Sequence, residues 1–340
     1  MFTNLSASGP ALSLYPASQR VTFLYNLGRF YFDFDHFYRA HMCLEEAYRQ
    51  CPPAFQKHRR QILTFWIPAN LLLGRFPSIS LLQRPEAAGF YDIFVPICAA
   101  VRSGNFLAFQ AAMAHNRDWL WAKGLYVTLF TRLKQLVWRS FTRRIFLLTW
   151  QQDQTAGGGG DMVNKAAVLS LDHVVTAAQY VQKLLEGYVA QRPPAPRAPP
   201  SHVSRIYLRA VSNSAAGGSE PLLLAPPAGG RPRRLMPMEG LVFGNKRPEL
   251  ETVEPIVANL VYAGFLNGFI ARQSGRFAVE GAKKAGGNAV RAGWPGAYQS
   301  VMERFREDYE VAVQRYNAGE GEPPGEMDDV PGWVRSHGGA

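Results

Sequence analysis

Small and apolar residues recur at fixed offsets over residues 21–54, and this spacing constrains the fold of the 340-residue chain most strongly. Gly28 and Ala40 are small enough to let two helix backbones approach each other. Leu24 and Leu44 stand where apolar side chains would fill the seam between such helices. The spacing therefore predicts a pair of antiparallel helices joined by a short turn.

The pattern resembles the tetratricopeptide repeat, with matching residues at Leu24, Leu27, Gly28, Tyr31, Ala40, Leu44, Ala47 and Pro52. Pro52 is expected to end the second helix, because proline cannot donate the next backbone hydrogen bond. One such pair cannot bury its own apolar face, so further helices must stack on it. They are predicted over residues 57–73, 91–102, 106–115 and 118–134.

Three more helices and two short β-like runs follow residue 134. The helices are predicted at about 135–149, from near Ser170, and after Thr252. The runs Gly268–Arg272 and Arg276–Glu280 surround a Gln-Ser-Gly turn, which is typical of a β-hairpin. Three helices followed by a hairpin make a winged helix. We therefore expect a mostly α fold, with tetratricopeptide-like helical repeats followed by a winged-helix module that has a small hairpin wing.

The predicted parts are a disordered N-terminus (1–17), helical repeats (18–134), a winged-helix module (135–281) and a C-terminal helix with an acidic tail (282–340). The module is expected to carry insertions at 153–168 and 187–248. The second insertion holds 11 Pro and 7 Gly in 62 positions, a composition that predicts a disordered or loosely packed segment.

The formal net charge of +11 is distributed unevenly along the chain. Residues 1–150 hold 17 Lys/Arg against 7 Asp/Glu, whereas residues 251–340 hold 9 against 12. A basic body with an acidic tail favours nucleic acid or an acidic protein as a partner. A solvated arginine-rich surface explains the same charge equally well.

Motifs for catalysis and metal binding are missing from the sequence. The seven histidines show no HExxH spacing, and the Gly157–Gly160 run lacks the Lys-Ser/Thr that closes a phosphate-binding loop. No apolar run is long enough to predict a membrane span. The three cysteines form no CxxC pair and indicate buried thiols in a reducing compartment. We therefore expect a non-enzymatic protein without a cofactor or a metal, located in the cytoplasm or the nucleus.

Helical repeats that lead into a winged helix resemble the PCI-domain family, and several local motifs narrow the likeness. They are Tyr25–Arg29, Lys57–Leu63, Leu72–Pro77, Gly104–Phe106, Ala258–Tyr262 and Gly268–Ile270. These motifs are similar to the branch that holds PCI-domain-containing protein 2, the PCI subunit of the nuclear transcription-export complex, and signalosome subunit 12. The insertion and the Asp329–Val334 segment look most like fungal members of the subunit 12 type.

The resemblance implies a winged helix that pairs with a larger PCI scaffold subunit, and a small acidic Sem-type subunit that clamps the helices. It also implies a composite surface for RNA or DNA, read without sequence specificity, in a complex that couples transcription to mRNA processing or export. The alternative is a purely structural scaffold subunit of a signalosome-like or lid-like complex, without nucleic-acid binding.

The third winged-helix helix is not predicted to read bases, because its outward positions include Glu254, Asn259 and Tyr262 and no Lys or Arg. These three residues are predicted to form a partner interface. Predicted nucleic-acid contacts in and after the wing are Arg272, Arg276, Lys283, Lys284 and Arg291, and those on the first helix are Arg139, Arg143 and Arg144. An ordinary solvated hairpin, and a face that pairs with acidic protein segments, remain the alternatives for the two groups.

Overall fold

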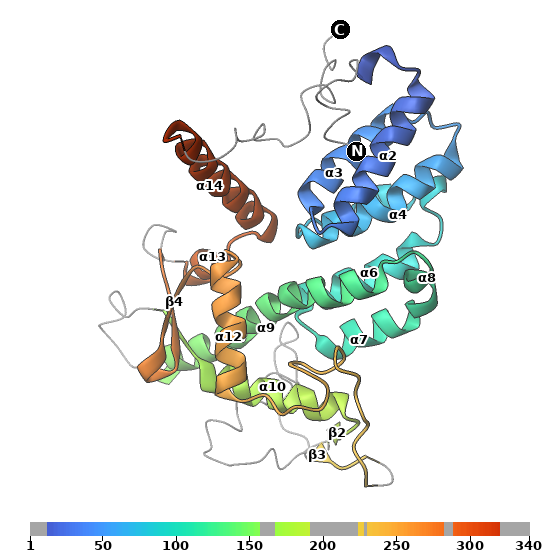
Figure 1. Cartoon of the computed structure of the whole chain (residues 1–340). Coiled ribbons are helices and arrows are strands. Elements are labelled where there is room, and N and C mark those ends of the chain that lie inside the picture. Colours follow the sequence, from blue (N-terminus) through green and yellow to red (C-terminus); the bar gives the residue numbers. More distant parts are fainter. Residues whose placement is uncertain (1–11, 157–166, 191–223, 228–229, 282–287, 320–340) are drawn as a thin grey trace. The chain divides into compact units, whose positions relative to one another are not determined.

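The computed structural model describes residues 12–156, 167–190, 224–227, 230–281 and 288–319 (Figure 1). The predicted contacts Lys283 and Lys284 lie outside these ranges. The chain forms two compact units. The first comprises Met1–Cys98, Trp119–Leu125 and Ala297–Ala340, and the second comprises Ala99–Asp118 and Tyr126–Gly296.

The first unit begins with a short 3-10 turn, η1 (Leu12–Leu14), and the predicted helix pair, α2 (Ala17–Asp33) and α3 (Phe37–Gln50). Gly28 brings the two helices together, because a Cβ atom at this position would lie 2.6 Å from Cγ of Leu44. Leu24 and Leu44 are fully buried in the seam, as the spacing predicts.

Next come α4 (Gln56–Leu72), α5 (Ile79–Leu82), the turn η2 (Pro85–Ala87) and the start of α6 (Phe90–Ser103). A buried polar cluster joins these elements to α3. The Tyr48 hydroxyl donates to a carboxylate oxygen of Glu86 at 2.6 Å, and Arg84 donates to the same hydroxyl at 2.8 Å. The Arg59 guanidinium carbon lies 4.1 Å from the centre of the Tyr48 ring.

His41 on α3 is another buried polar residue of this unit. Its Nδ1 accepts a hydrogen bond from Trp66 Nε1 at 2.9 Å, and its Nε2 lies 3.1 Å from Arg75. Burial, helped by the charge of Arg75, lowers the pKa of His41 to about 4. The predicted C-terminal helix, α14 (Ala297–Asn317), belongs to the same unit, and the Arg75 guanidinium carbon lies 4.8 Å from the ring centre of Tyr298.

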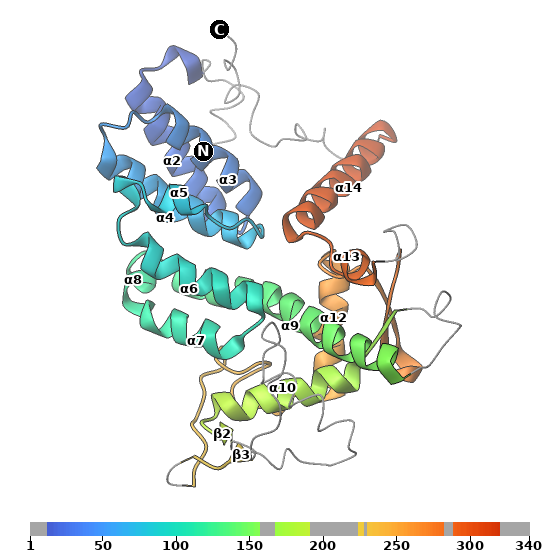
Figure 2. The same ribbon diagram turned by 180° about the vertical axis from the view of Figure 1, so that it is seen from behind.

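The second unit holds α7 (Phe106–His115), the first residues of α8 (Arg117–Ala122) and the long helix α9 (Tyr126–Ala156) (Figure 2). Here the predicted helix bounds were wrong: the boundary placed between residues 134 and 135 falls inside α9. The helical structure is interrupted at Gly124 instead, where φ is +71° and a glycine is favoured.

The winged helix is built from β1 (Val168–Ser170), α10 (Leu171–Leu185), α12 (Leu250–Tyr262), β4 (Gly268–Ala271) and β5 (Arg276–Val279). The two strands of the predicted hairpin are joined by η3 (Arg272–Ser274) and by Gly275 in a left-handed conformation. β1, which the sequence pattern did not predict, pairs antiparallel with β5, and the strand order is β1-β5-β4. Phe277 faces the core of the module and contacts Trp294 in an edge-to-face arrangement.

α12 begins three residues before the predicted start. Glu249 and Thr252 form a capping box, in which each side chain binds the backbone N–H of the other residue. Pro255 therefore lies in the second turn of the helix, where its missing N–H removes one helix hydrogen bond.

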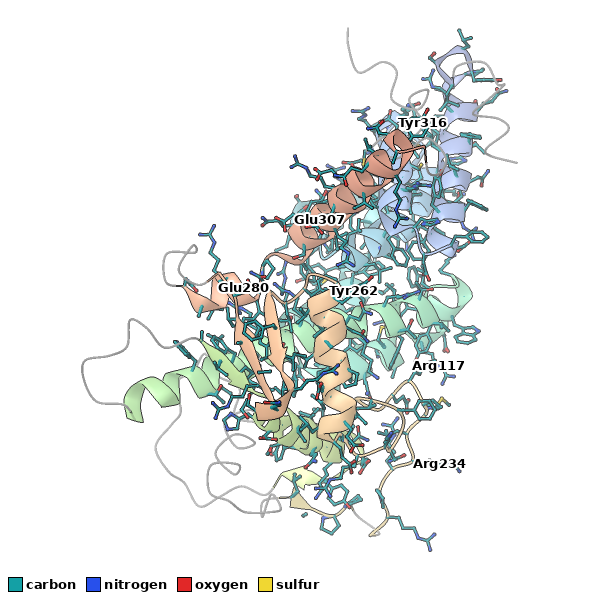
Figure 3. All side chains as sticks on the ribbon, turned by 60° about the vertical axis from the view of Figure 1, so that its left-hand side comes forward. Arg117, Arg234, Tyr262, Glu280, Glu307 and Tyr316 are labelled. Atoms are coloured by element: carbon teal, nitrogen blue, oxygen red, sulfur yellow. The ribbon has the colours of Figure 1, made fainter. Side chains whose placement is uncertain are left out.

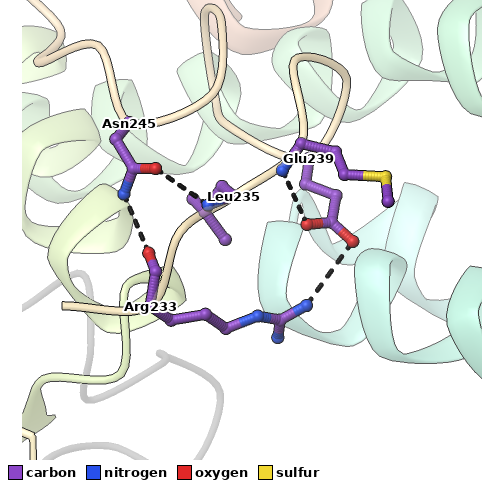
Figure 4. Close-up of polar contacts among 5 residues, drawn as sticks. Arg233, Leu235, Glu239 and Asn245 are labelled. Carbon is purple, nitrogen blue, oxygen red and sulfur yellow. Dashed lines mark hydrogen bonds and ion pairs between the residues drawn. The ribbon is translucent and has the colours of Figure 1, made fainter.

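Residues 230–248 of the second insertion are held against the unit by a few buried side chains, although the composition of 187–248 predicted a disordered or loosely packed segment. We call these residues the strap. Leu235 and Leu241 of the strap are 6% and 1% exposed. Asn245 links the end of the strap back to its beginning. Its side-chain amide donates to the Arg233 carbonyl, and its side-chain oxygen accepts from Leu235 N–H (Figure 4).

The strap is anchored to α10 and α9 through its main chain. Gln182 on α10 is 3% exposed; its amide donates to the Gly244 carbonyl at 2.9 Å and its oxygen accepts from Leu241 N–H at 3.0 Å. The Lys134 ammonium on α9 donates to the carbonyls of Met238 and Gly240. Side chains of the two helices thus satisfy strap backbone groups that burial would otherwise leave without partners.

Candidate interface on the winged helix

The outward face of α12 carries the three predicted interface residues. Val253, Val257 and Leu260 are buried on the opposite face, so the apolar stripe packs into the module as expected. Glu254 is half-buried and Asn259 is exposed. Tyr262, at the end of the helix, is 74% exposed, and Figure 3 shows it at the helix terminus.

β4 carries an exposed apolar side chain at one edge of the three-stranded sheet. Phe269 pairs in register with Ala278, and Ala271 with Arg276, so these four residues share the face opposite the buried Phe277. Phe269 is 59% exposed although it is large and aromatic. Sequence reasoning had not selected it, but the alternation of the strand would have placed it opposite the core.

Arg272 and Arg276 mark the tip of the wing. The Arg272 Nε lies 3.0 Å from a carboxylate oxygen of Glu254, and the Arg272 side chain remains 83% exposed. A predicted nucleic-acid contact is therefore paired with a predicted protein contact. Arg276 is exposed and stands between Ala271 and Ser170 in the sheet register.

Arg139 on α9 is occupied within the unit and does not belong to the outer surface where it was predicted. Its guanidinium donates to the backbone carbonyls of Trp294 and Pro295, which follow α13 (Ala289–Gly293). Burial, helped by the nearby charge of Arg143, lowers the pKa of Arg139 to about 10. These hydrogen bonds link α9 to the residues after α13 and occupy the Arg139 guanidinium, so it is not available to a nucleic acid.

The remaining predicted cations fall at two ends of the hairpin. Arg272 and Arg276 lie at the turn, whereas Arg291 on α13 lies at the end where Gly293 contacts Val279 and Asn267. Four-residue strands separate these ends by about 10 Å. Arg143 is exposed one turn beyond Arg139 on α9, and Arg144 beside it is half-buried. The structure therefore does not gather the predicted cations into one patch.

Within the described ranges, no group of three or more His, Cys, Asp or Glu side chains is placed to hold a metal ion. No helix in this part of the chain is both long and apolar enough to cross a bilayer. Cys43, Cys51 and Cys98 are buried free thiols, as the cysteine pattern predicted.

Comparison with known proteins gives consistent relatives. No family model matches the sequence. The chain is 30% identical over 170 residues to a PCI domain-containing protein of Schizosaccharomyces pombe, which covers 49% of this chain and 38% of that protein. It is 34% identical over 137 residues to PCI domain-containing protein 2 of Xenopus laevis, covering 39% of this chain and 32% of the relative.

A third relative is the CSN12 homolog of Gibberella zeae, 30% identical over 139 residues, with 41% of this chain and 30% of the relative covered. The matches thus span well under half of these relatives' own length. Helical repeats, a winged helix and these similarities agree with the resemblance found in the sequence. The chain is thus similar to PCI-domain proteins, in the branch that includes PCI domain-containing protein 2 and the fungal CSN12 homologs.

Proposed function

We propose that this chain is a non-enzymatic PCI adaptor subunit that pairs its winged helix with the winged helix of a larger PCI scaffold subunit. Two exposed aromatic side chains carry the proposal: Tyr262 at the end of α12 and Phe269 on β4. Tyr262 and Phe269 are 74% and 59% exposed, and exposed aromatic side chains are typical anchors of protein interfaces. β4 also has an outer edge to which a second chain can add.

A pull-down tests the pairing. Tyr262→Ala combined with Phe269→Ala is expected to remove most of the scaffold subunit that co-purifies with the tagged chain. Tyr316→Ala on α14 is the matched control, because Tyr316 is also exposed (47%) but belongs to the other unit. Equal recovery of the scaffold with the double variant and the control would show that the interface lies elsewhere.

The adaptor further contacts RNA or DNA without sequence specificity through the tip of the wing. Arg272 and Arg276 are both exposed there, and neither stands on a helix that could enter a major groove. Contact of these two cations with two phosphates predicts a slope of about −1.4 to −1.8 for log affinity against log salt. Arg272→Glu with Arg276→Glu should abolish this salt dependence, whereas an unchanged slope would exclude the wing.

The second candidate function is a scaffold subunit that binds proteins only. The Arg272–Glu254 ion pair favours it, because the carboxylate already neutralises one of the two wing-tip cations. Ultraviolet crosslinking followed by a nuclease-treated pull-down separates the candidates. A scaffold that is retained without any nucleic acid crosslinked to this chain would support the second candidate and overturn the first.

We further propose that the chain works in a complex that couples transcription to mRNA processing or export. Such a complex acts in the nucleus, where RNA and DNA are present. The proposed small acidic Sem-type subunit fits the basic balance of residues 1–150, with 17 Lys/Arg against 7 Asp/Glu. Mass spectrometry of the tagged chain purified from nuclear and cytoplasmic fractions tests both points.

A further inference from the structure

A cavity of about 180 Å³ lies in the second unit, away from α12 and the wing. Three helices and the strap enclose it. Its lining residues are Leu107, Gln110, Ala111 and Ala114 of α7, Tyr126 and Phe130 of α9, Leu184 and Leu185 of α10, and Arg233 and Glu239 of the strap.

The cavity has about the volume of one side chain, and most of its lining residues are apolar. Leu185 and Phe130 are buried there, whereas Ala111 and Ala114 are exposed at the α7 side. A protein cavity of about 150 Å³ lined by Leu, Ile and Phe accepts a benzene molecule. A leucine or phenylalanine side chain inserted from a partner would therefore fit.

The rim of the cavity is mainly cationic. The Arg117 guanidinium carbon lies 6.0 Å from the ring centre of Tyr126, and Arg233 projects from the strap with its side chain 63% exposed. Exposed Arg234 follows on the strap, and in Figure 3 both Arg117 and Arg234 project from the same side of the unit. Glu239 is the acid in the lining, and it lies 3.4 Å from Arg233 (Figure 4).

We propose that this cavity is a docking site for a partner peptide in which one aliphatic or aromatic side chain is flanked by carboxylates. The apolar side chain fills the cavity, and the carboxylates bind Arg117 and Arg233 beside it. The site uses neither the α12–β4 face nor the tip of the wing, and it rests on the part of the proposed function that gives the chain an acidic protein partner.

The Arg233–Glu239 pair does not block such a peptide. An ion pair with a largely exposed partner contributes little net free energy, so an incoming carboxylate can share or replace Glu239. Glu239 keeps a second role after such an exchange, since its other oxygen accepts from Met236 N–H at 3.0 Å. Arg233 is thus positioned by the strap and remains able to bind a carboxylate.

A nucleic acid fits the cavity poorly. Single strands are held by bases stacked on exposed aromatic faces next to cations. The aromatic residues of the lining, Tyr126 and Phe130, are 8% and 2% exposed and offer no such face.

Fluorescence polarisation with a labelled synthetic peptide tests the proposal. The probe is a short peptide with a Leu-Phe core flanked on both sides by Asp and Glu. Its matched controls carry an Ala-Ala core with the same flanks, or the same core with Lys flanks. The full chain is expected to bind the probe at least about tenfold more tightly than either control.

Protein variants separate the cavity from the rest of the surface. Ala114→Trp fills the cavity from an exposed position and should weaken the probe about tenfold or more, whereas Ala108→Trp, exposed on α7 outside the lining, should not. Arg117→Glu with Arg233→Glu should also lose the probe, and Arg276→Glu at the wing should retain it. Tyr262→Ala should leave the probe bound, so failure of scaffold pairing is distinguishable from failure of this site.

Three results would overturn the proposal. They are unchanged binding to Ala114→Trp, equal binding of the Lys-flanked peptide, and displacement of the probe by a single-stranded oligonucleotide. If Ala114→Trp does not fold, methyl NMR of the unmodified chain decides: the signals of Leu107 and Leu184 must shift when the probe is added, and their failure to shift would equally exclude the cavity.

Discussion

The Nε of Arg272 in the wing turn lies 3.0 Å from a carboxylate oxygen of Glu254 on α12. The arginine side chain is 83% exposed and the glutamate side chain 23%. Solvent screens such a pair, which typically contributes between 0 and about 1 kcal/mol to stability. The ion pair therefore governs the charge that the wing presents more than it governs the fold.

Replacing Glu254 with Gln is expected to increase oligonucleotide affinity a few-fold, because Arg272 then carries an uncompensated charge. Thermal unfolding should change little. Filter binding at low salt measures the affinity. The matched control is Glu251→Gln, an exposed acid in the first turn of the same helix. An equal gain in the control would mean that net charge alone matters and that the ion pair has no specific effect.

Replacing Gly28 with Ala is expected to destabilise the first unit by about 1–3 kcal/mol, although alanine favours helices. The added Cβ would lie 2.6 Å from Leu44 Cγ and 2.9 Å from Leu44 Cδ2, so the seam must open. Urea unfolding gives the free energy. In the Leu44→Ala background the same change should become neutral or stabilising, and simple additivity of the two changes would contradict the close packing.

Replacing Gln182 with Leu is expected to release the strap. The change leaves the Gly244 carbonyl and the Leu241 N–H without their side-chain partner, at about 1–3 kcal/mol for each group that stays buried. Hydrogen exchange at the Leu241 amide should accelerate accordingly. Gln179→Ala on the same helix removes one hydrogen bond to the Pro248 carbonyl and one from Arg247, and it should leave the Leu241 amide protected. Protection in both variants would show that Gln182 is not the anchor.

His41 is expected to make the first unit acid-sensitive. Burial lowers its pKa from 6.5 to about 4, so between these values the unfolded chain takes up a proton that the folded chain does not. Stability must therefore fall as pH drops from about 6.5 towards 4, by up to about 3 kcal/mol at the acid end. In His41→Gln, which keeps an oxygen acceptor for Trp66, urea unfolding free energies should show a flatter slope across this range. An unchanged slope would assign the acid sensitivity to other groups.

Arg139 and Arg143 lie one turn apart on α9, but replacing them should affect the melting temperature differently. Arg139→Leu removes the donor to the Trp294 and Pro295 carbonyls and should lower the melting temperature. Arg143→Leu, at an exposed position, should leave the melting temperature almost unchanged. Scanning calorimetry compares the two variants, and equal effects would contradict the structural role of Arg139.

Local packing signals predicted the helix pair and the hairpin well. Gly28 and Leu44 specify the α2–α3 seam by spacing alone, and Gly275 supplies the left-handed residue that the wing turn requires. The exposed face of α12 also followed from the period of its apolar stripe. For the candidate interface, this period placed Glu254, Asn259 and Tyr262 on the outward face of α12.

Features that depend on distant partners were missed. The three residues of β1 become a strand only because β5 lies beside them, and no local pattern marks so short a run. The strap is rich in Pro and Gly, which predicts disorder, yet Gln182 and Lys134 order it from other helices. Arg139 looked like a surface cation because its carbonyl partners lie more than 150 positions later in the chain.

The pairing of β2 (Val189–Ala190) with β3 (Leu224–Ala225) has a practical consequence for engineering. It places Ala190 opposite Leu224 in an antiparallel ladder, although the two residues are far apart in the sequence. Because the entropy of closing a loop grows slowly with its length, each doubling of the chain between them should cost only about 0.6 kcal/mol. A fluorescent or affinity tag inserted between these two positions should therefore leave the pairing of β2 with β3 intact, with both chain ends unmodified.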